Sequence, residues 1–239
     1  MTHGVRAGIA VVALGAIAAA APAQALAAPK VEQLVVFKNG DAKQKSVVAS
    51  KVTVTVGKKR CAVGAGTPLA ALLRSKIGAI RLKDYGACSS KPADAAGLYV
   101  ARIRKDSAKG VNGWVYKVGK RVAPAGAGDP TGPFGSGRLK PCARLTWFYC
   151  RMKAKGCQRT LAITKVETPG GGEVRVSVRA YDDHGKGRAA AGATVHVGSA
   201  TAKADSKGVA TLTAAPGRVA AHATGKGVVR SFREQIEVK

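Results

Sequence analysis

Cysteine is the residue type in this chain with the most chemistry open to it, and the sequence holds five cysteines. Cys150 and Cys157 bracket a short basic loop directly after the aromatic run LTWFY (145–149). A thioredoxin-like redox pair has two residues between its thiols, a spacing that Cys150 and Cys157 do not have. A closed zinc site needs four nitrogen or sulfur ligands, and the nearest histidine downstream is His184. The spacing therefore favours a disulfide that closes a small loop.

The N-terminus predicts an oxidising compartment, in which such a disulfide persists. Arg6 precedes an Ala/Val/Ile/Leu-rich run over residues 8–21, and the tripeptide Ala-Leu-Ala at 25–27 fits the cleavage rule of secretory signal peptides. The run is shorter than the roughly 20 apolar residues that span a bilayer. We therefore predict a cleaved signal peptide over residues 1–27, no transmembrane segment after cleavage, and a secreted, extracellular or cell-wall-associated protein.

Four aromatic side chains form a second candidate set. Trp114 and Tyr116 share one face of a predicted strand, and Trp147 and Tyr149 share one face of another, because side chains at i and i+2 point the same way. If the two strands are neighbours, the four rings form one cluster. Such a cluster fits either a hydrophobic core or a ligand-binding face on which a small planar ligand stacks.

Residues suited to catalysis are sparse. No G-x-S-x-G elbow occurs, residues 28–160 hold no histidine, and their six carboxylates are spread along the chain without a local pair. The Gly- and Pro-rich loop at 123–138 lacks the Gly-Lys-Ser/Thr ending of a phosphate-binding loop. The sequence therefore predicts no enzyme, no metal site and no cofactor. An extracellular enzyme whose carboxylates meet only in the folded chain is the remaining catalytic alternative.

Charge is distributed unevenly along the chain. Residues 28–160 contain 27 Lys and Arg against 6 Asp and Glu, a net charge of +21, whereas residues 161–239 contain 12 against 7, a net charge of +5. This asymmetry predicts two domains, 28–160 and 161–239. A strongly cationic domain attracts polyanions such as acidic wall polymers and anionic surfaces, although such a surface also serves solubility alone. We expect no specific nucleic acid partner.

The elements that must position these residues are mostly strands. In the first domain, a turn at Asn39-Gly40 and period-two alternation predict strands, and Thr67 and Pro68 predict the start of a helix over 66–75. The strands are expected at 52–56, 79–85, 97–103, 113–119 and 145–149. Strands around one early helix indicate an α+β domain rather than a parallel α/β one.

Residues 161–239 predict an all-β module. The segment 173–181 alternates cleanly between valines and polar residues, and turn clusters separate further short strands. These are expected at 193–197, 209–213, 217–223 and 228–238. Regularly spaced short strands are typical of a β-sandwich. His196 and His222 fall on the polar phase of their strands, so we expect surface residues rather than metal ligands.

A resemblance to a known family lies in five successive segments. They are CAVGAGTPLAALL (61–73), DYGAC (84–88), LYVARI (98–103), GWVYKVGKR (113–121) and LTWFYC (145–150). Over about residues 50–160 the chain resembles bacterial secreted domains of unknown function that are similar to the C-terminal β-domain of transcobalamin and intrinsic factor. The resemblance implies a β-grasp-like fold with one short helix. It would also allow the aromatic face to hold a planar ligand such as a corrin, although a cobalamin-binding partnership would also call for an α-helical barrel domain, which this chain lacks.

The same resemblance implies a cysteine pairing. It assigns the disulfides Cys61–Cys88 and Cys150–Cys157, and the sequence departs from the family pattern at Cys142 in LKPCARL. Cys142 is therefore the expected unpaired thiol, either free or linking two copies of the chain in a dimer.

Residues 187–225 are similar to carboxypeptidase-regulatory and bacterial Ig-like modules, which usually serve as spacers or adhesion elements. The chain is thus expected to be mostly β, with a basic β-grasp-like domain followed by an Ig-like sandwich. The function expected is that of a secreted, non-catalytic binding or cell-envelope-associated protein whose basic domain contacts polyanions. The alternative is a carrier of a small planar, corrinoid-like ligand on the aromatic face.

Overall fold

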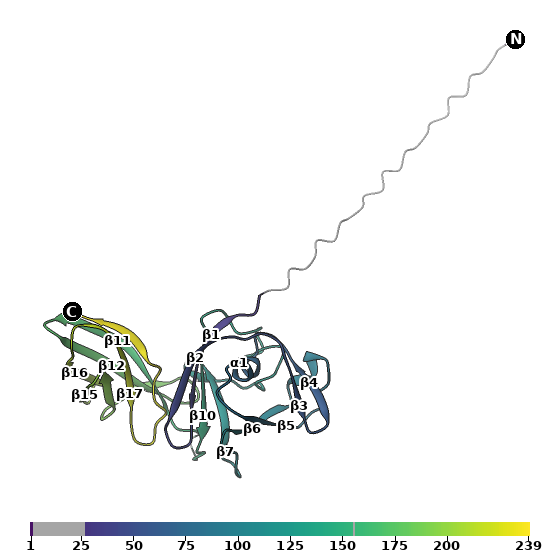
Figure 1. The fold of residues 1–239 in the computed structure, drawn as a ribbon, viewed down its shortest axis with the longest axis horizontal. Coiled ribbons are helices and arrows are strands. Elements are labelled where there is room, and N and C mark those ends of the chain that lie inside the picture. The colour runs from purple at the N-terminus through teal and green to yellow at the C-terminus, as the bar shows by residue number, and fades with distance from the viewer. Residues whose placement is uncertain (2–26, 155) are drawn as a thin grey trace.

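The structure, a computed structural model, describes residue 1 and residues 27–154 and 156–239. The predicted signal peptide, residues 1–27, lies outside the described residues except at its two ends. Of the described residues, 50% are in strands and 5% in helices, which confirms the expected mostly-β class. Figure 1 shows two lobes, one built from the strands up to β10 and one from β11 onward.

A five-stranded sheet organises the first lobe, with the strand order β2-β1-β10-β8-β9. Its strands are β1 (Lys30–Val36), β2 (Ala42–Val48), β8 (Gly113–Val118), β9 (Arg121–Val122) and β10 (Arg144–Cys150). β1 pairs with β10 in parallel, and the other pairs are antiparallel. The turn between β1 and β2 contains Gly40 at a φ of +94°, a backbone conformation that glycine adopts readily.

Helix α1 (Pro68–Arg74) lies against one face of this sheet, as Figure 1 shows. The Thr67 hydroxyl accepts a hydrogen bond from the Ala70 N–H at 3.2 Å, so Thr67 caps the helix as the sequence predicts. Leu69 and Leu72 are fully buried in a core that also contains Val35 and Trp147. The helix is therefore fixed by its apolar side, since seven residues are too few for a helix stable alone.

Two smaller sheets close the first lobe around the same core. One consists of β3 (Val52–Val56) and β4 (Lys59–Val63). The other consists of β5 (Ile80–Asp84), β6 (Leu98–Ile103) and β7 (Asp106–Ser107), with the 3₁₀ helix η1 (Pro92–Ala95) between β5 and β6. The disulfide Cys61–Cys88 joins β4 to the segment after β5 and is buried.

The second lobe contains two four-stranded sheets. One holds β11 (Thr160–Gly170), β12 (Glu173–Tyr181), β13 (Gly187–Ala189) and β16 (Val209–Thr213), and the other holds β14 (Thr194–Val197), β15 (Ala200–Lys203), β17 (Gly217–Thr224) and β18 (Glu234–Val238). Alternate valines of β12 and β14 lie in one apolar cluster between the sheets. The period-two pattern of each strand therefore supplies the buried face of its sheet.

The lobes meet across the other face of the five-stranded sheet. Phe148 of β10 packs in one buried cluster with Val229 and Phe232 of the second lobe. The strand expected over 228–238 begins only at Glu234, because residues 228–233 instead supply these contacts with the first lobe. Arg144 reinforces the joint through two hydrogen bonds, of 2.6 and 2.7 Å, to the Glu234 carboxylate.

Candidate functional site

The four aromatic residues singled out in the sequence do lie together. β8 and β10 are neighbours, with Trp147 opposite Tyr116 and Tyr149 opposite Trp114. The ring centroids of Tyr116 and Trp147 are 5.1 Å apart, and those of Trp114 and Tyr149 are 5.9 Å apart at an interplanar angle of 90°. All four side chains are buried in the core beneath α1. None of these rings therefore offers an exposed face to a ligand as large as a corrin.

Three of the four rings have their polar atom satisfied. The Tyr116 hydroxyl donates to the Ala125 carbonyl at 2.7 Å, and burial raises the pKa of Tyr116, so the phenol stays protonated. The Trp114 Nε1–H donates to the Asp106 carbonyl at 2.8 Å, and the Tyr149 hydroxyl donates to the Ser107 carbonyl. The Trp147 Nε1–H is buried without an acceptor. An unpaired buried donor costs free energy, so the Trp147 N–H is a locally destabilising feature of this core.

Beside Trp147 lies a mostly apolar pocket of about 250 Å³. Its lining includes Leu98, Tyr99, Trp114, Tyr116, Ala127 and Trp147. Sites for drug-sized ligands usually measure roughly 300–1,000 Å³. The pocket is therefore below the usual size of a drug-sized ligand site and too small for a corrinoid.

The cysteines are paired as the family resemblance implies, in the bridges Cys61–Cys88 and Cys150–Cys157. The second bridge closes the loop that leads from β10 into the second lobe. Cys142 is exposed and belongs to neither bridge. Its φ of +60° places it in a tight turn before β10, where the Cys142 N–H donates to the Lys30 carbonyl.

No group of three or more His, Cys, Asp or Glu side chains within the described ranges is arranged to hold a metal ion. His196 and His222 face each other across β14 and β17 as stacked rings, with centroids 4.5 Å apart. Burial, together with the nearby guanidinium of Arg230, lowers the pKa of both, that of His222 to about 4. Both imidazoles are half-buried and neutral at neutral pH, so they add nothing to the positive charge of the protein.

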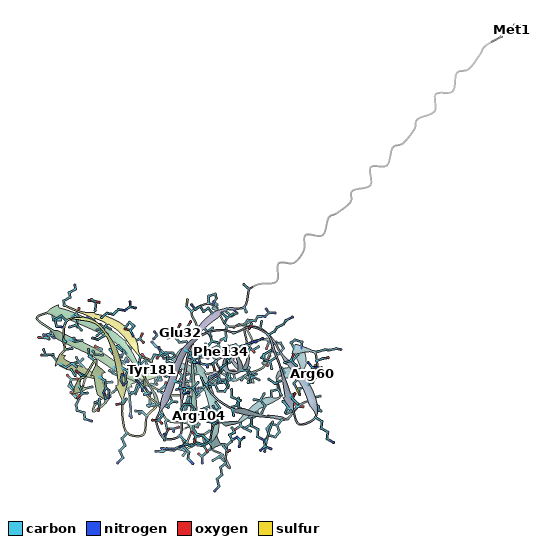
Figure 2. All side chains as sticks on the ribbon, viewed as in Figure 1. Met1, Glu32, Arg60, Arg104, Phe134 and Tyr181 are labelled. Atoms are coloured by element: carbon cyan, nitrogen blue, oxygen red, sulfur yellow. A yellow bond between two sulfur atoms is a disulfide. The ribbon has the colours of Figure 1, made fainter. Side chains whose placement is uncertain are left out.

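The sequence reasoning missed Lys117, which is fully buried between the lobes. Its Nζ donates to the carbonyls of Asp182 at 2.8 Å and Tyr181 at 3.1 Å and to the Thr160 hydroxyl at 3.3 Å. The Asp183 carboxylate lies 3.6 Å away. Figure 2 places Tyr181 where the two lobes meet. The sequence feature that could have identified it is a lysine within GWVYKVG, a strand that is apolar on both faces. An unpaired charge in such a strand would be costly.

Three of the seven acidic residues of the second lobe lie at this joint. Four Lys and Arg side chains from residues 28–160 lie within ion-pair distance of an acid in the described chain: Lys59, Lys117, Arg144 and Arg159. Three of the four acids, Asp182, Asp183 and Glu234, belong to the second lobe. The other described Lys and Arg side chains of the first lobe have no carboxylate within ion-pair distance.

No helix among the described residues is both long and apolar enough to cross a bilayer. Scans of the chain against models of known protein families, against curated proteins and against solved structures find no match. Function must therefore be inferred from the chemistry of the surfaces themselves.

Proposed function

We propose that this chain is an exported, non-catalytic binding protein that holds anionic polymers of the cell envelope on its first lobe. The observation that carries the proposal is the excess of cations on that lobe, which its own carboxylates do not neutralise. Such a surface concentrates polyanions and binds them with release of counterions. The two disulfides support an oxidising compartment, because they persist there and are rare in the cytosol.

The second lobe fits the role of a rigid spacer. It carries fewer cations, three of its seven acids lie at the joint, and its contacts with the first lobe are both apolar and charged. Because the two lobes are joined by these apolar and charged contacts, the second lobe fixes the orientation of the cationic lobe. We propose a spacer or adhesion role for it.

Retention on isolated bacterial cell envelopes tests the polyanion proposal. The purified protein is mixed with envelopes at about 0.05 M and about 0.5 M salt, and the bound fraction is measured after sedimentation. We expect binding to fall by tenfold or more over this range, because salt screens exposed charges and opposes counterion release. Negligible retention at both salt concentrations, or retention that salt does not change, would contradict the proposal.

The unsatisfied Trp147 N–H favours a second candidate function, the binding of a small planar ligand in the pocket beside it. Aromatic neighbours such as Tyr116 would stack on the ligand, and Trp147 would donate to a ring nitrogen or carbonyl of the ligand. This candidate keeps the planar-ligand hypothesis but restricts it to ligands small enough for the pocket of about 250 Å³.

Tryptophan fluorescence tests this candidate, since the chain has two tryptophans and both line the pocket. We expect purine to change the emission saturably, and Trp147→Phe to weaken its binding about fivefold to tenfold through loss of the hydrogen bond. Cobalamin serves as the oversized control and is expected to cause no saturable change. A flat response to purine, or equal affinity in the Trp147→Phe variant, rejects the pocket as a ligand site.

A further inference from the structure

The outer face of the sheet formed by β5, β6 and β7 is cationic and exposed. The alternate residues Ile80, Leu82, Leu98, Val100 and Ile103 face the core. Arg81, Lys83 and Arg102 point the other way and are exposed. Figure 1 shows β5 on the side of the first lobe remote from the second lobe. The second lobe therefore leaves this face open to a ligand.

A wide groove of about 660 Å³ runs over this face. Its lining includes Arg81, Lys83, Tyr85, Tyr99, Arg102 and Ser107. Tyr85 is 72% exposed, the largest exposure of any aromatic side chain among the described residues. A groove that combines three cations with an exposed ring offers both charge and an apolar surface to one ligand.

Two arginines lie directly opposite each other in this groove. Arg81 on β5 pairs in register with Arg102 on β6, beside a bulge between Arg81 and Leu82. Side chains at such positions start about 5 Å apart, and like charges placed there repel. Neither guanidinium has an acidic partner within the described ranges. An anion bound between them would relieve this repulsion.

The acid closest in sequence to these cations is already committed elsewhere. The Asp84 carboxylate accepts hydrogen bonds from the Gly86 and Cys88 N–H groups and from the Lys59 ammonium. Partial desolvation alone would raise the pKa of Asp84, but these three donors outweigh it and lower the pKa. Asp84 is thus ionised and its carboxylate is taken up by these three donors. Arg81 and Arg102 therefore stay available to an external anion.

The turn that carries the exposed Tyr85 ring is held in place by backbone contacts. The Tyr85 N–H donates to the Gly97 carbonyl at 3.0 Å, and a Cβ on Gly97 would lie 2.6 Å from the Gly86 nitrogen, so the turn needs glycine to lie this close to β6. Three residues further on, Cys88 is anchored to Cys61. The Tyr85 ring is therefore presented on a rigid turn, 5.9 Å from Tyr99.

We propose that this groove binds a linear acidic polysaccharide, with a sugar ring on Tyr85 and its acid groups on Arg81 and Arg102. The inference rests on the proposed function and names its ligand and its site. Guanidinium forks match carboxylate oxygens in two parallel hydrogen bonds. The Tyr85 and Tyr99 rings are tilted by 57°, which does not suit successive stacked bases of a nucleic acid. A single sugar ring needs only one aromatic face.

Binding of polygalacturonate, measured by calorimetry at two or more salt concentrations, tests the inference. We expect Arg81→Gln/Arg102→Gln to weaken binding by at least tenfold and to reduce the salt dependence by about two released ions. The matched control is Arg138→Gln/Lys140→Gln, which removes the same charge from exposed residues outside the groove. The affinity of this control variant for polygalacturonate is expected to stay within about twofold of that of the parent protein. Circular dichroism checks that each variant is folded.

Substitutions of Tyr85 distinguish a site that binds a sugar ring from one that binds by charge alone. We expect Tyr85→Ala to weaken polygalacturonate binding about fivefold and Tyr85→Phe to retain it, because the ring and not the hydroxyl makes the contact. Binding of inorganic polyphosphate, which has charge but no sugar, is expected to be the same in all three proteins. Equal polygalacturonate affinity in Tyr85→Ala would overturn the inference.

The remaining outcomes distinguish this site from the broader proposal. If the parent protein binds neither polygalacturonate nor polyphosphate, both the proposed function and this inference fail. If it binds them but the groove variant and the control variant weaken equally, the polyanion function stands and the groove is rejected as its site. Tighter binding of single-stranded oligothymidylate than of polygalacturonate, lost in the groove variant, would make the groove a nucleic acid site and overturn the inference.

Discussion

Replacing Lys117 with alanine is expected to lower the free energy of unfolding by about 3–5 kcal/mol, the range for breaking a buried charge pair. The substitution removes a donor that three groups at the joint share: the carbonyls of Tyr181 and Asp182 and the hydroxyl of Thr160. It also leaves the partly buried Asp183 carboxylate without its cation. The Asp182 carbonyl keeps the Gly185 N–H as a donor, and each hydrogen bond lost at a buried acceptor costs free energy.

The position of Lys117 makes this a test of how the lobes are joined. Its side chain starts on β8 in the first lobe, and the groups to which its Nζ donates lie at the start of β11 and at the end of β12 or just after it. Burial lowers its pKa, while the nearby Asp183 opposes that shift and favours the ammonium form. The parent protein is therefore expected to unfold in urea as one unit, and Lys117→Ala as two separate transitions.

Two further variants complete the test. Lys117→Met keeps the apolar volume and removes the desolvated charge along with its hydrogen bonds, so we expect a smaller loss of about 2–3 kcal/mol. Lys109→Ala, at an exposed loop position, should change stability by less than about 0.5 kcal/mol. If Lys117→Ala unfolds with the midpoint of the parent protein, Lys117 contributes nothing to the joint.

The parts of this fold that the sequence predicts are those set by local patterns. The alternation in residues 173–181 and 209–213 predicts strands whose bounds match the structure. Thr67 and Pro68 mark the start of the helix because capping depends on neighbouring residues alone. The i, i+2 spacing of the four aromatic residues likewise predicts shared strand faces, which the pairing of β8 with β10 confirms.

The parts that the sequence does not reveal depend on long-range pairing. Nothing local shows that Arg81 will lie opposite Arg102, because that register depends on a bulge and on which strand β5 pairs with. The partners of Lys117 are 43 to 66 residues away, so its hydrogen bonds appear only once the lobes are docked. Whether the aromatic cluster is a core or a ligand face depends on what covers it, and α1 with the two smaller sheets covers it.

Removing the Cys61–Cys88 bridge, as Cys61→Ala/Cys88→Ala, is expected to lower the free energy of unfolding by about 3.5 kcal/mol. The bridge closes a loop with a sequence separation of 27, and loop-closure entropy in the unfolded chain gives roughly this value. For a chain of this size the melting temperature should fall by about 7–14 °C. Calorimetry and urea unfolding of the oxidised proteins measure both quantities.

The second bridge supplies the matched comparison, because Cys150–Cys157 has a separation of only 7. Chain entropy predicts a loss of roughly 2.5 kcal/mol for Cys150→Ala/Cys157→Ala, less than for the longer loop. The reverse order would show that packing at the lobe joint, where Cys150 and Cys157 lie in the cluster with Phe232, outweighs chain entropy. The longer bridge also anchors the turn that presents Tyr85, so its loss should weaken polygalacturonate binding while loss of the shorter bridge leaves that binding unchanged.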